Sequence, residues 1–145
     1  RKEEGLKLKK DIELRLGNLR NELNKVEKQL PAEHKKRMSK LKKRLSELTS
    51  NIQLDKTRIN QEIAIIAEKS DITEEVVRLK SHFSQFEKIA KDKDPAGRRL
   101  NFLLQEIGRE INTIGSKSFS DKIVNIIIIM KDEAEKIREQ IQNIL

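Results

Sequence analysis

Apolar residues in the first third of the chain recur at alternating spacings of three and four positions, the heptad pattern of a narrow helical seam. A first seam ends at Pro31, where we expect the helix to end, because proline lacks an amide hydrogen and its ring clashes with the preceding turn. Two seams joined by a tight turn predict a long antiparallel, coiled-coil-like hairpin over residues 1–54. The seam positions are Ile12, Leu16, Leu19, Leu23, Val26 and Leu30 before the proline, and Met38, Leu41, Leu45, Leu48 and Ile52 after it.

Residues 55–145 show the broader apolar periodicity of ordinary core helices and predict a bundle of about four helices. The expected spans are about 56–69, 71–90, 95–114 and 118–145. Pro95 suits the first position of the third helix, and Gly115 suits a left-handed residue that ends it. We therefore expect an all-α protein in which a hairpin (1–54) is followed by a helical C-terminal domain (55–145).

The beginning of the last expected helix is apolar on every side, with Ile126, Ile128 and Ile129 in its first turns. We expect a neighbouring helix, a second subunit or a missing domain to cover it. The longest unbroken apolar run, 126–130, is far shorter than the roughly 20 residues that span a bilayer. With no signal peptide recognised, we expect a cytoplasmic protein without a membrane partner.

The composition supports this helical fold class. Aromatic residues make up 3% of the chain, which has 5 Gly and 2 Pro, too few for a sheet with its frequent turns. The chain has no Cys, which excludes disulfides, zinc–thiolate sites and thiol nucleophiles. It begins at Arg1 rather than at Met, as we expect of a fragment of a longer protein.

The positive charge is concentrated in one part of the chain. The formal net charge is +8, and residues 1–54 hold all of the excess, with 16 Lys and Arg against 8 Asp and Glu. This asymmetry predicts an arm that binds a polyanion, joined to an electrically balanced part. The alternative is a lysine-rich helix whose charges only keep a coiled coil in solution.

The expected helix 95–114 has a polar face of unusual composition. Its members are Arg98, Asn101, Gln105, Arg109 and Asn112, spaced three and four positions apart. Arg, Asn and Gln form directed hydrogen bonds, and the amides favour the helix less than Lys or Glu would. Gly108 costs about 1 kcal/mol of helix stability relative to Ala, which indicates a close approach to the backbone. This face is therefore a candidate binding surface.

Three further features admit both a chemical and a structural interpretation. Glu106 and Glu110, one turn apart, suit a divalent cation, or alternatively salt bridges with Arg99 or Arg109. His82 suits proton transfer, or alternatively a structurally satisfied imidazole. The segment 115–118, with Ser116 and Lys117, suits a phosphate, or alternatively an ordinary connection between two helices.

The chain resembles the C-terminal region of the YicC/YloC family of bacterial endoribonucleases over essentially all of its length. The resemblance rests on several long motifs. These include Ser70-Asp-Ile-Thr-Glu-Glu75, Arg78-Leu-Lys-Ser-His82, Gly97-Arg-Arg-Leu100, Arg109-Glu-Ile-Asn-Thr-Ile-Gly-Ser-Lys-Ser118 and Arg138-Glu-Gln-Ile-Gln-Asn143. At Asn101 and Gly108 the chain departs from many members, in which Asp and Asn are common at these positions.

The resemblance implies RNA cleavage, a divalent metal (Mn²⁺ or Mg²⁺), a cytoplasmic location and a ring-like homo-oligomer, a hexamer in the full-length protein. It also implies an N-terminal α/β domain that is absent here. The candidate catalytic residues are Glu106, Glu110 and His82, and the candidate metal ligands are Glu106, Glu110, Glu62 and Glu75. The candidate RNA-binding residues are Arg98, Arg99, Gln105, Arg109, Asn112, Ser116 and Lys117.

Three hypotheses remain at this point. In the first, the chain is the helical domain of a metal-dependent endoribonuclease, and whether it cleaves RNA alone is left open. In the second, it is an RNA-binding and oligomerisation module, and the catalytic groups lie in the missing domain. In the third, it is a coiled-coil scaffold without affinity for RNA.

Overall fold

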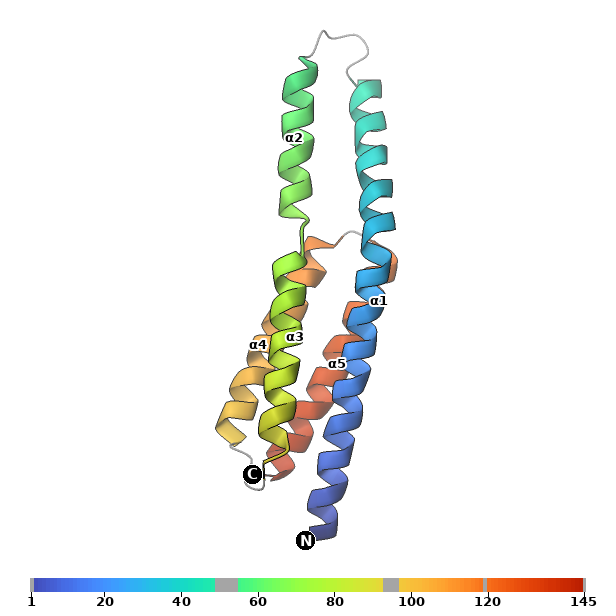
Figure 1. Cartoon of the computed structure of the whole chain (residues 1–145). Helices are drawn as coiled ribbons and strands as arrows, with labels where there is room; N and C mark the ends of the chain where they lie inside the picture. The colour runs from blue at the N-terminus through green and yellow to red at the C-terminus, as the bar shows by residue number, and fades with distance from the viewer. Residues whose placement is uncertain (1, 49–54, 93–96, 119, 145) are drawn as a thin grey trace. The chain divides into compact units, whose positions relative to one another are not determined.

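The computed structural model describes residues 2–48, 55–92, 97–118 and 120–144, which form five helices and no strand (Figure 1). The helices are α1 (Lys2–Leu48), α2 (Lys56–Lys69), α3 (Thr73–Ala90), α4 (Gly97–Lys117) and α5 (Asp121–Ile144). The all-α prediction is confirmed. None of the helices in these residues is long and apolar enough to cross a membrane. The expected start of a helix at Pro95 lies outside the described residues.

The predicted helix end at Pro31 is wrong. α1 continues through this residue as one helix of 47 residues, so residues 2–48 do not form a hairpin at the proline. The last expected hairpin residues, 49–54, lie outside the described part of the chain. A proline inside a helix costs about 3 kcal/mol, from one lost hydrogen bond and a steric clash. Pro31 is exposed, and strong helix formers such as Glu33, Lys35 and Lys36 follow it. The long helix tolerates this local cost.

The chain divides into two compact units. One comprises Arg1–Val26 with Ile72–Leu145, and the other comprises Glu27–Asp71. α1 therefore contributes its beginning to the first unit and its end to the second, and these limits differ from the expected division after residue 54.

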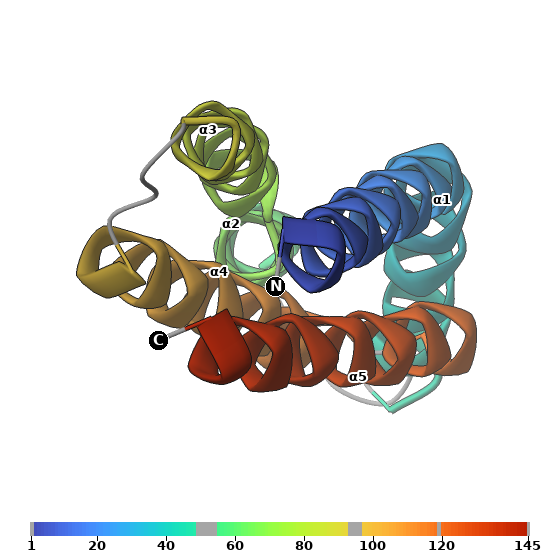
Figure 2. The same ribbon diagram turned by 90° about the horizontal axis from the view of Figure 1, so that it is seen from below.

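In the first unit the beginning of α1 joins α3, α4 and α5, and α4 packs against both α3 and α5 (Figure 2). The core side chains come from all four segments. Those without exposed surface include Leu19, Leu79, Phe83, Phe86, Ile107, Ile111, Ile114, Met130 and Ile137. Each such side chain contributes about 1.5–3 kcal/mol by burial. Polar contacts add to the attachment of α1, because Arg20 pairs with Glu87 at 2.7 Å and Arg15 with Glu133 at 3.3 Å.

Gly115 does not end a helix as predicted. α4 continues to Lys117, and no glycine in the described residues has a positive φ angle. A Cβ atom at Gly115 would lie 3.2 Å from Cγ2 of Ile127. The glycine therefore permits close packing of α4 against α5 rather than a left-handed turn.

The apolar beginning of α5 is only partly covered within the described residues. Ile126 is buried, but 59% of Ile128 and 48% of Ile129 are exposed. Neighbouring helices of this chain thus cover one side of α5, and a cover for the other side stays a prediction.

The second unit contains the end of α1 and all of α2. Asp55 caps α2, because its side chain accepts a hydrogen bond of 3.0 Å from the Thr57 amide. Ile63 is buried and Met38, Leu41 and Leu45 are half-buried, so the apolar seam of α1 continues into this unit. Its basic side chains Lys35, Lys36, Lys40, Lys42, Lys43 and Arg44 are exposed. These side chains, which we call the basic face of α1, place part of the excess positive charge of residues 1–54 at the surface.

Candidate functional site

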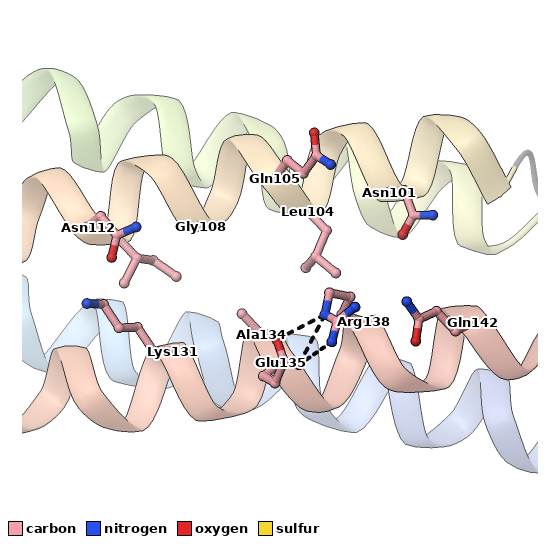
Figure 3. Close-up of a pocket in the computed structure, with 11 residues that line it drawn as sticks. Asn101, Leu104, Gln105, Gly108, Asn112, Lys131, Ala134, Glu135, Arg138 and Gln142 are labelled. Carbon is pink, nitrogen blue, oxygen red and sulfur yellow. Dashed lines mark hydrogen bonds and ion pairs between the residues drawn. The ribbon is translucent and has the colours of Figure 1, made fainter.

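An open groove of about 410 Å³ lies between α4 and α5 (Figure 3). α4 contributes residues near positions 101, 105, 108 and 112, and α5 contributes residues near 131, 135, 138 and 142, spacings that place each set on one helix face. The lining residues are Asn101, Leu104, Gln105, Gly108, Ile111, Asn112, Lys131, Ala134, Glu135, Arg138 and Gln142. Polar side chains thus surround an apolar floor, and we call the whole hollow the α4–α5 groove.

Four amide side chains in this groove have no hydrogen-bond partner among the described residues: Asn101, Gln105, Asn112 and Gln142. Figure 3 shows Asn101 opposite Gln142 at one end and Asn112 opposite Lys131 at the other. Each amide offers both a donor and an acceptor. The groove therefore presents hydrogen-bonding groups of both kinds to a ligand.

The two cations of the groove differ in their availability. Nε of Arg138 donates hydrogen bonds of 3.1 and 3.0 Å to the two carboxylate oxygens of Glu135. This bond lowers the pKa of the Glu135 carboxyl below its ordinary value. Lys131 is exposed and forms no ion pair within the part of the chain that the structure describes. Lys131 thus supplies the uncompensated positive charge.

A second hollow of about 550 Å³ continues along the polar face of α4. It is lined by Gln105, Gly108, Arg109, Asn112, Thr113 and Ser116. The side chain of Arg109 is 74% exposed, and its Nη1 lies 3.8 Å from Oε1 of Glu106. This long, exposed ion pair leaves the guanidinium accessible to an anion. The predicted polar face is therefore present, and Gln105 and Asn112 line both hollows.

On the side of α4 that faces α3, buried carboxylates hold cations. Oε1 of Glu110 accepts a hydrogen bond of 2.8 Å from Nε of Arg78, and Oε1 of Glu75 accepts one of 2.8 Å from Lys117. Glu75 and Glu110 are 3% and 6% exposed. The second oxygen of Glu75, Oε2, is buried without a hydrogen-bond partner among the described residues.

These ion pairs determine the charge state of Glu75. Its burial alone would raise the pKa of the carboxyl, but the hydrogen bond from Lys117 and the charges of Lys117 and Arg78 outweigh burial and lower it. The pKa of Arg78 is raised, mainly by its hydrogen bond to Glu110. Two carboxylates that we expected as metal ligands thus form structural ion pairs, and the partner of Glu110 is Arg78 rather than Arg99 or Arg109.

The candidate metal ligands of the first unit form no preformed metal site among the described residues. Glu75 and Glu110 are paired as above, Glu106 is half-buried, and Glu62 is exposed on α2, in the other compact unit. Within the described ranges no three His, Cys, Asp or Glu side chains form a group suited to a metal ion. His82 is half-buried on α3, and its Nδ1 is buried without a described hydrogen-bond partner.

The remaining candidate RNA-binding residues lie at the two ends of α4. Arg98 and Arg99 are exposed in its first turn and form no ion pair with any described residue. Ser116 is exposed, and its hydroxyl donates to the Thr113 carbonyl at 3.0 Å. Lys117 instead bonds Glu75, as described above.

Sequence reasoning missed the half of the groove that α5 contributes. Lys131, Arg138 and Gln142 repeat at helical spacing beside the apolar stripe of α5, which is the pattern that could have identified them. The spacing alone does not show which helix α5 faces.

Fold and groove together define an all-helical domain with a polar, weakly cationic groove. Residues 26–145 match the C-terminal region of the YicC-like endoribonucleases. A probable endoribonuclease YicC of Clostridioides difficile is 47% identical over 145 residues, which are 99% of this chain and 50% of that protein. A probable endoribonuclease YicC of Haemophilus influenzae is 36% identical over 141 residues, 97% of this chain and 48% of that protein. The chain belongs to the YicC-like endoribonuclease family and spans about half the length of these curated relatives.

Proposed function

We propose that this chain is the RNA-binding helical part of an endoribonuclease and that the α4–α5 groove contacts the RNA. The observation that supports this most strongly is the set of four unpartnered amides around the groove, together with the exposed Lys131. RNA offers acceptors on its phosphates and both donors and acceptors on its bases and 2′-hydroxyls, which match amide side chains.

The cations near the groove suit the phosphodiester backbone. Arg109 lines the adjoining hollow, and Arg98 and Arg99 project from the first turn of the same helix. Phosphate contacts supply affinity that falls as the salt concentration rises. The exposed basic face of α1 adds charge of the same sign in the second unit.

A divalent cation, Mn²⁺ or Mg²⁺, is proposed only on the family resemblance. The carboxylates present do not fit a preformed site, because Glu75 and Glu110 are held by Lys117 and Arg78 and the described residues contain no suitable group of three. We therefore assign no step of the reaction to a metal. Among the candidate carboxylates of the first unit, Glu106, with its long ion pair to Arg109, is the one most available to a cation.

The same ion pairs favour a second candidate function. If the carboxylates of this chain serve the fold, the chain is a non-catalytic RNA-binding and oligomerisation module, and the catalytic groups lie elsewhere in a longer protein. Ile128 and Ile129, exposed on α5, suit a contact with a second copy. Homo-oligomerisation and a cytoplasmic location are part of either proposal.

Binding of a labelled single-stranded RNA, measured by fluorescence anisotropy, tests the groove. We expect Asn101→Ala with Gln142→Ala to raise the Kd about tenfold, since two hydrogen bonds contribute about 1.4 kcal/mol together. Asn21→Ala, which removes an exposed amide from α1, is the matched control. Equal affinity of all three proteins, or no RNA binding by the unmodified chain, would contradict the proposal.

Cleavage of RNA in the presence of Mn²⁺ separates the two candidate functions. It is measured for the chain alone and for a chimera in which the chain replaces the matching half of the C. difficile relative. An enzymatic role of Glu106 predicts that Glu106→Gln lowers cleavage while RNA binding and the free energy of unfolding are unchanged. Unchanged cleavage in a Glu106→Gln, Glu110→Gln double variant supports the non-catalytic module.

A further inference from the structure

Gly108 lies in the middle of α4, although no contact among the described residues requires a glycine there. Its φ angle is not positive, and a Cβ atom built at this position would meet no atom within 4 Å. Glycine disfavours a helix relative to alanine. Gly115, seven residues later, differs because α5 packs directly against it. The absence of a side chain at Gly108 therefore leaves open space beside the helix backbone.

This open space belongs to the proposed binding site. Gly108 lines both the α4–α5 groove and the hollow beside it. Gln105 and Asn112, one turn before and after it on the same face, line both hollows as well. The apolar part of the lining of the α4–α5 groove consists of Leu104 and Ile111 from α4 and Ala134 from α5. A flat, partly apolar group could therefore lie against the α4 backbone, and the amides of Gln105 and Asn112 could form hydrogen bonds with the edges of this group.

We propose that an unpaired nucleobase of the RNA lies against the α4 backbone at Gly108, with its edges hydrogen-bonded by Gln105 and Asn112. The inference rests on the proposed function of the α4–α5 groove and specifies the part of the RNA that it recognises. Unpaired bases expose both faces and both donor and acceptor edges, whereas those in a duplex are stacked and paired.

The chemistry of the lining favours a base over a phosphate. A phosphate only accepts hydrogen bonds and is best met by cations, but within the α4–α5 groove Arg138 is already paired with Glu135 and Lys131 lies at one end. Arg109 lines only the adjoining hollow, where it suits the phosphate next to the base. The lining also disfavours a second helix, because the positions one turn from Gly108 hold Leu104 and Asn112 rather than small residues. A nucleobase uses both the amides and the apolar floor.

Gly108→Ala is the decisive variant because it has opposite effects on folding and on binding. We expect a higher urea midpoint of unfolding, since alanine favours the helix and meets no neighbour, but at least a tenfold loss of affinity for an unpaired oligonucleotide. Gly17→Ala in α1, where a Cβ also meets nothing within 4 Å, is the control. It should raise the urea midpoint and leave the affinity unchanged.

An abasic oligonucleotide of the same length isolates the contribution of the bases. We expect the unmodified chain to bind the base-containing strand at least tenfold more tightly than the abasic strand. In Gly108→Ala the affinities for the two strands should become nearly equal. Equal binding of both strands by the unmodified chain overturns the inference and leaves the proposed function intact. If the unmodified chain binds neither strand, both the inference and the proposed function are overturned. An unchanged affinity in Gly108→Ala, with a change only in self-association by sedimentation, overturns the inference in favour of a second copy at this surface.

Discussion

Nε of Arg78 lies 2.8 Å from Oε1 of Glu110, so a half-exposed guanidinium of α3 is anchored by a buried carboxylate of α4. The same guanidinium approaches Glu75 at 3.5 Å through Nη2. Glu75 in turn bonds Lys117 near the end of α4. These contacts connect α3 to two successive parts of α4 and help to position the helix that bears the polar face.

Removal of Arg78 should destabilise the fold. Arg78→Met leaves the buried Glu110 carboxylate without its partner, and we expect the free energy of unfolding to fall by about 2–3 kcal/mol. Urea denaturation followed by circular dichroism measures the change. Arg109→Met, which breaks a long ion pair of an exposed side chain, should cost no more than about 0.5 kcal/mol. Equal losses in the two variants would show that the Arg78 anchor is unimportant.

The lowered pKa of Glu75 predicts a specific dependence of stability on pH. A carboxyl with a lower pKa in the folded than in the unfolded state stabilises the fold above its unfolded pKa, which is near 4.5. This contribution disappears as the pH falls through the lower, folded pKa. We therefore expect the unmodified chain to lose more unfolding free energy than Glu75→Gln between about pH 5 and pH 3. Parallel pH profiles of the two proteins would contradict this.

Gly115 and Gly17 should respond differently to alanine. Gly17→Ala meets no neighbour and should stabilise the chain by about 0.5–1 kcal/mol. Gly115→Ala places a methyl group 3.2 Å from the buried Ile127, so we expect overpacking to cancel the gain. Melting temperatures of the two variants provide the comparison. A similar rise in both would show that α5 yields easily at Gly115.

The exposed lysines near the end of α1 should contribute to RNA binding mainly through charge. Lys42→Gln with Lys43→Gln should reduce the slope of log K against log salt by about 1.4, the value for two lost contacts with single-stranded phosphates. Lys7→Gln with Lys10→Gln removes the same charge from exposed positions near the start of α1. If both pairs changed the slope equally, the effect would arise from net charge rather than from the basic face.

The helical class and the polar face of α4 could be predicted because both depend on spacing along one helix. Asn101, Gln105 and Asn112 share a face in any α-helix, whatever packs beside it. Lys131 and Gln142 could not be assigned to the same groove, since the pairing of α4 with α5 depends on tertiary packing. The prediction that the helix ends at Pro31 was wrong for a different reason. The local effect of the proline was outweighed by the strong helix formers around it.

The roles of Glu75 and Glu110 illustrate a further limit of sequence reasoning. Their cations, Lys117 and Arg78, are 42 and 32 residues distant along the chain. The spacing of Glu106 and Glu110 suggested a shared metal ion because the spacing describes the positions of residues within one helix and not their neighbours on other helices. Once α3 packs against α4, Glu110 faces Arg78 and Glu106 remains beside Arg109.

If the α4–α5 groove binds RNA as proposed, the internal pairing of Arg138 with Glu135 affects how tightly a strand is retained. Because this arginine is neutralised within its own turn of α5, it adds little to the long-range attraction that Lys131 would exert on a sugar–phosphate backbone. Retention of a strand would then depend mainly on short-range hydrogen bonds and packing in the groove, which are lost when a fragment shifts along it. Under the proposed function, such weak retention would let a short RNA fragment leave the groove quickly and free it for the next strand.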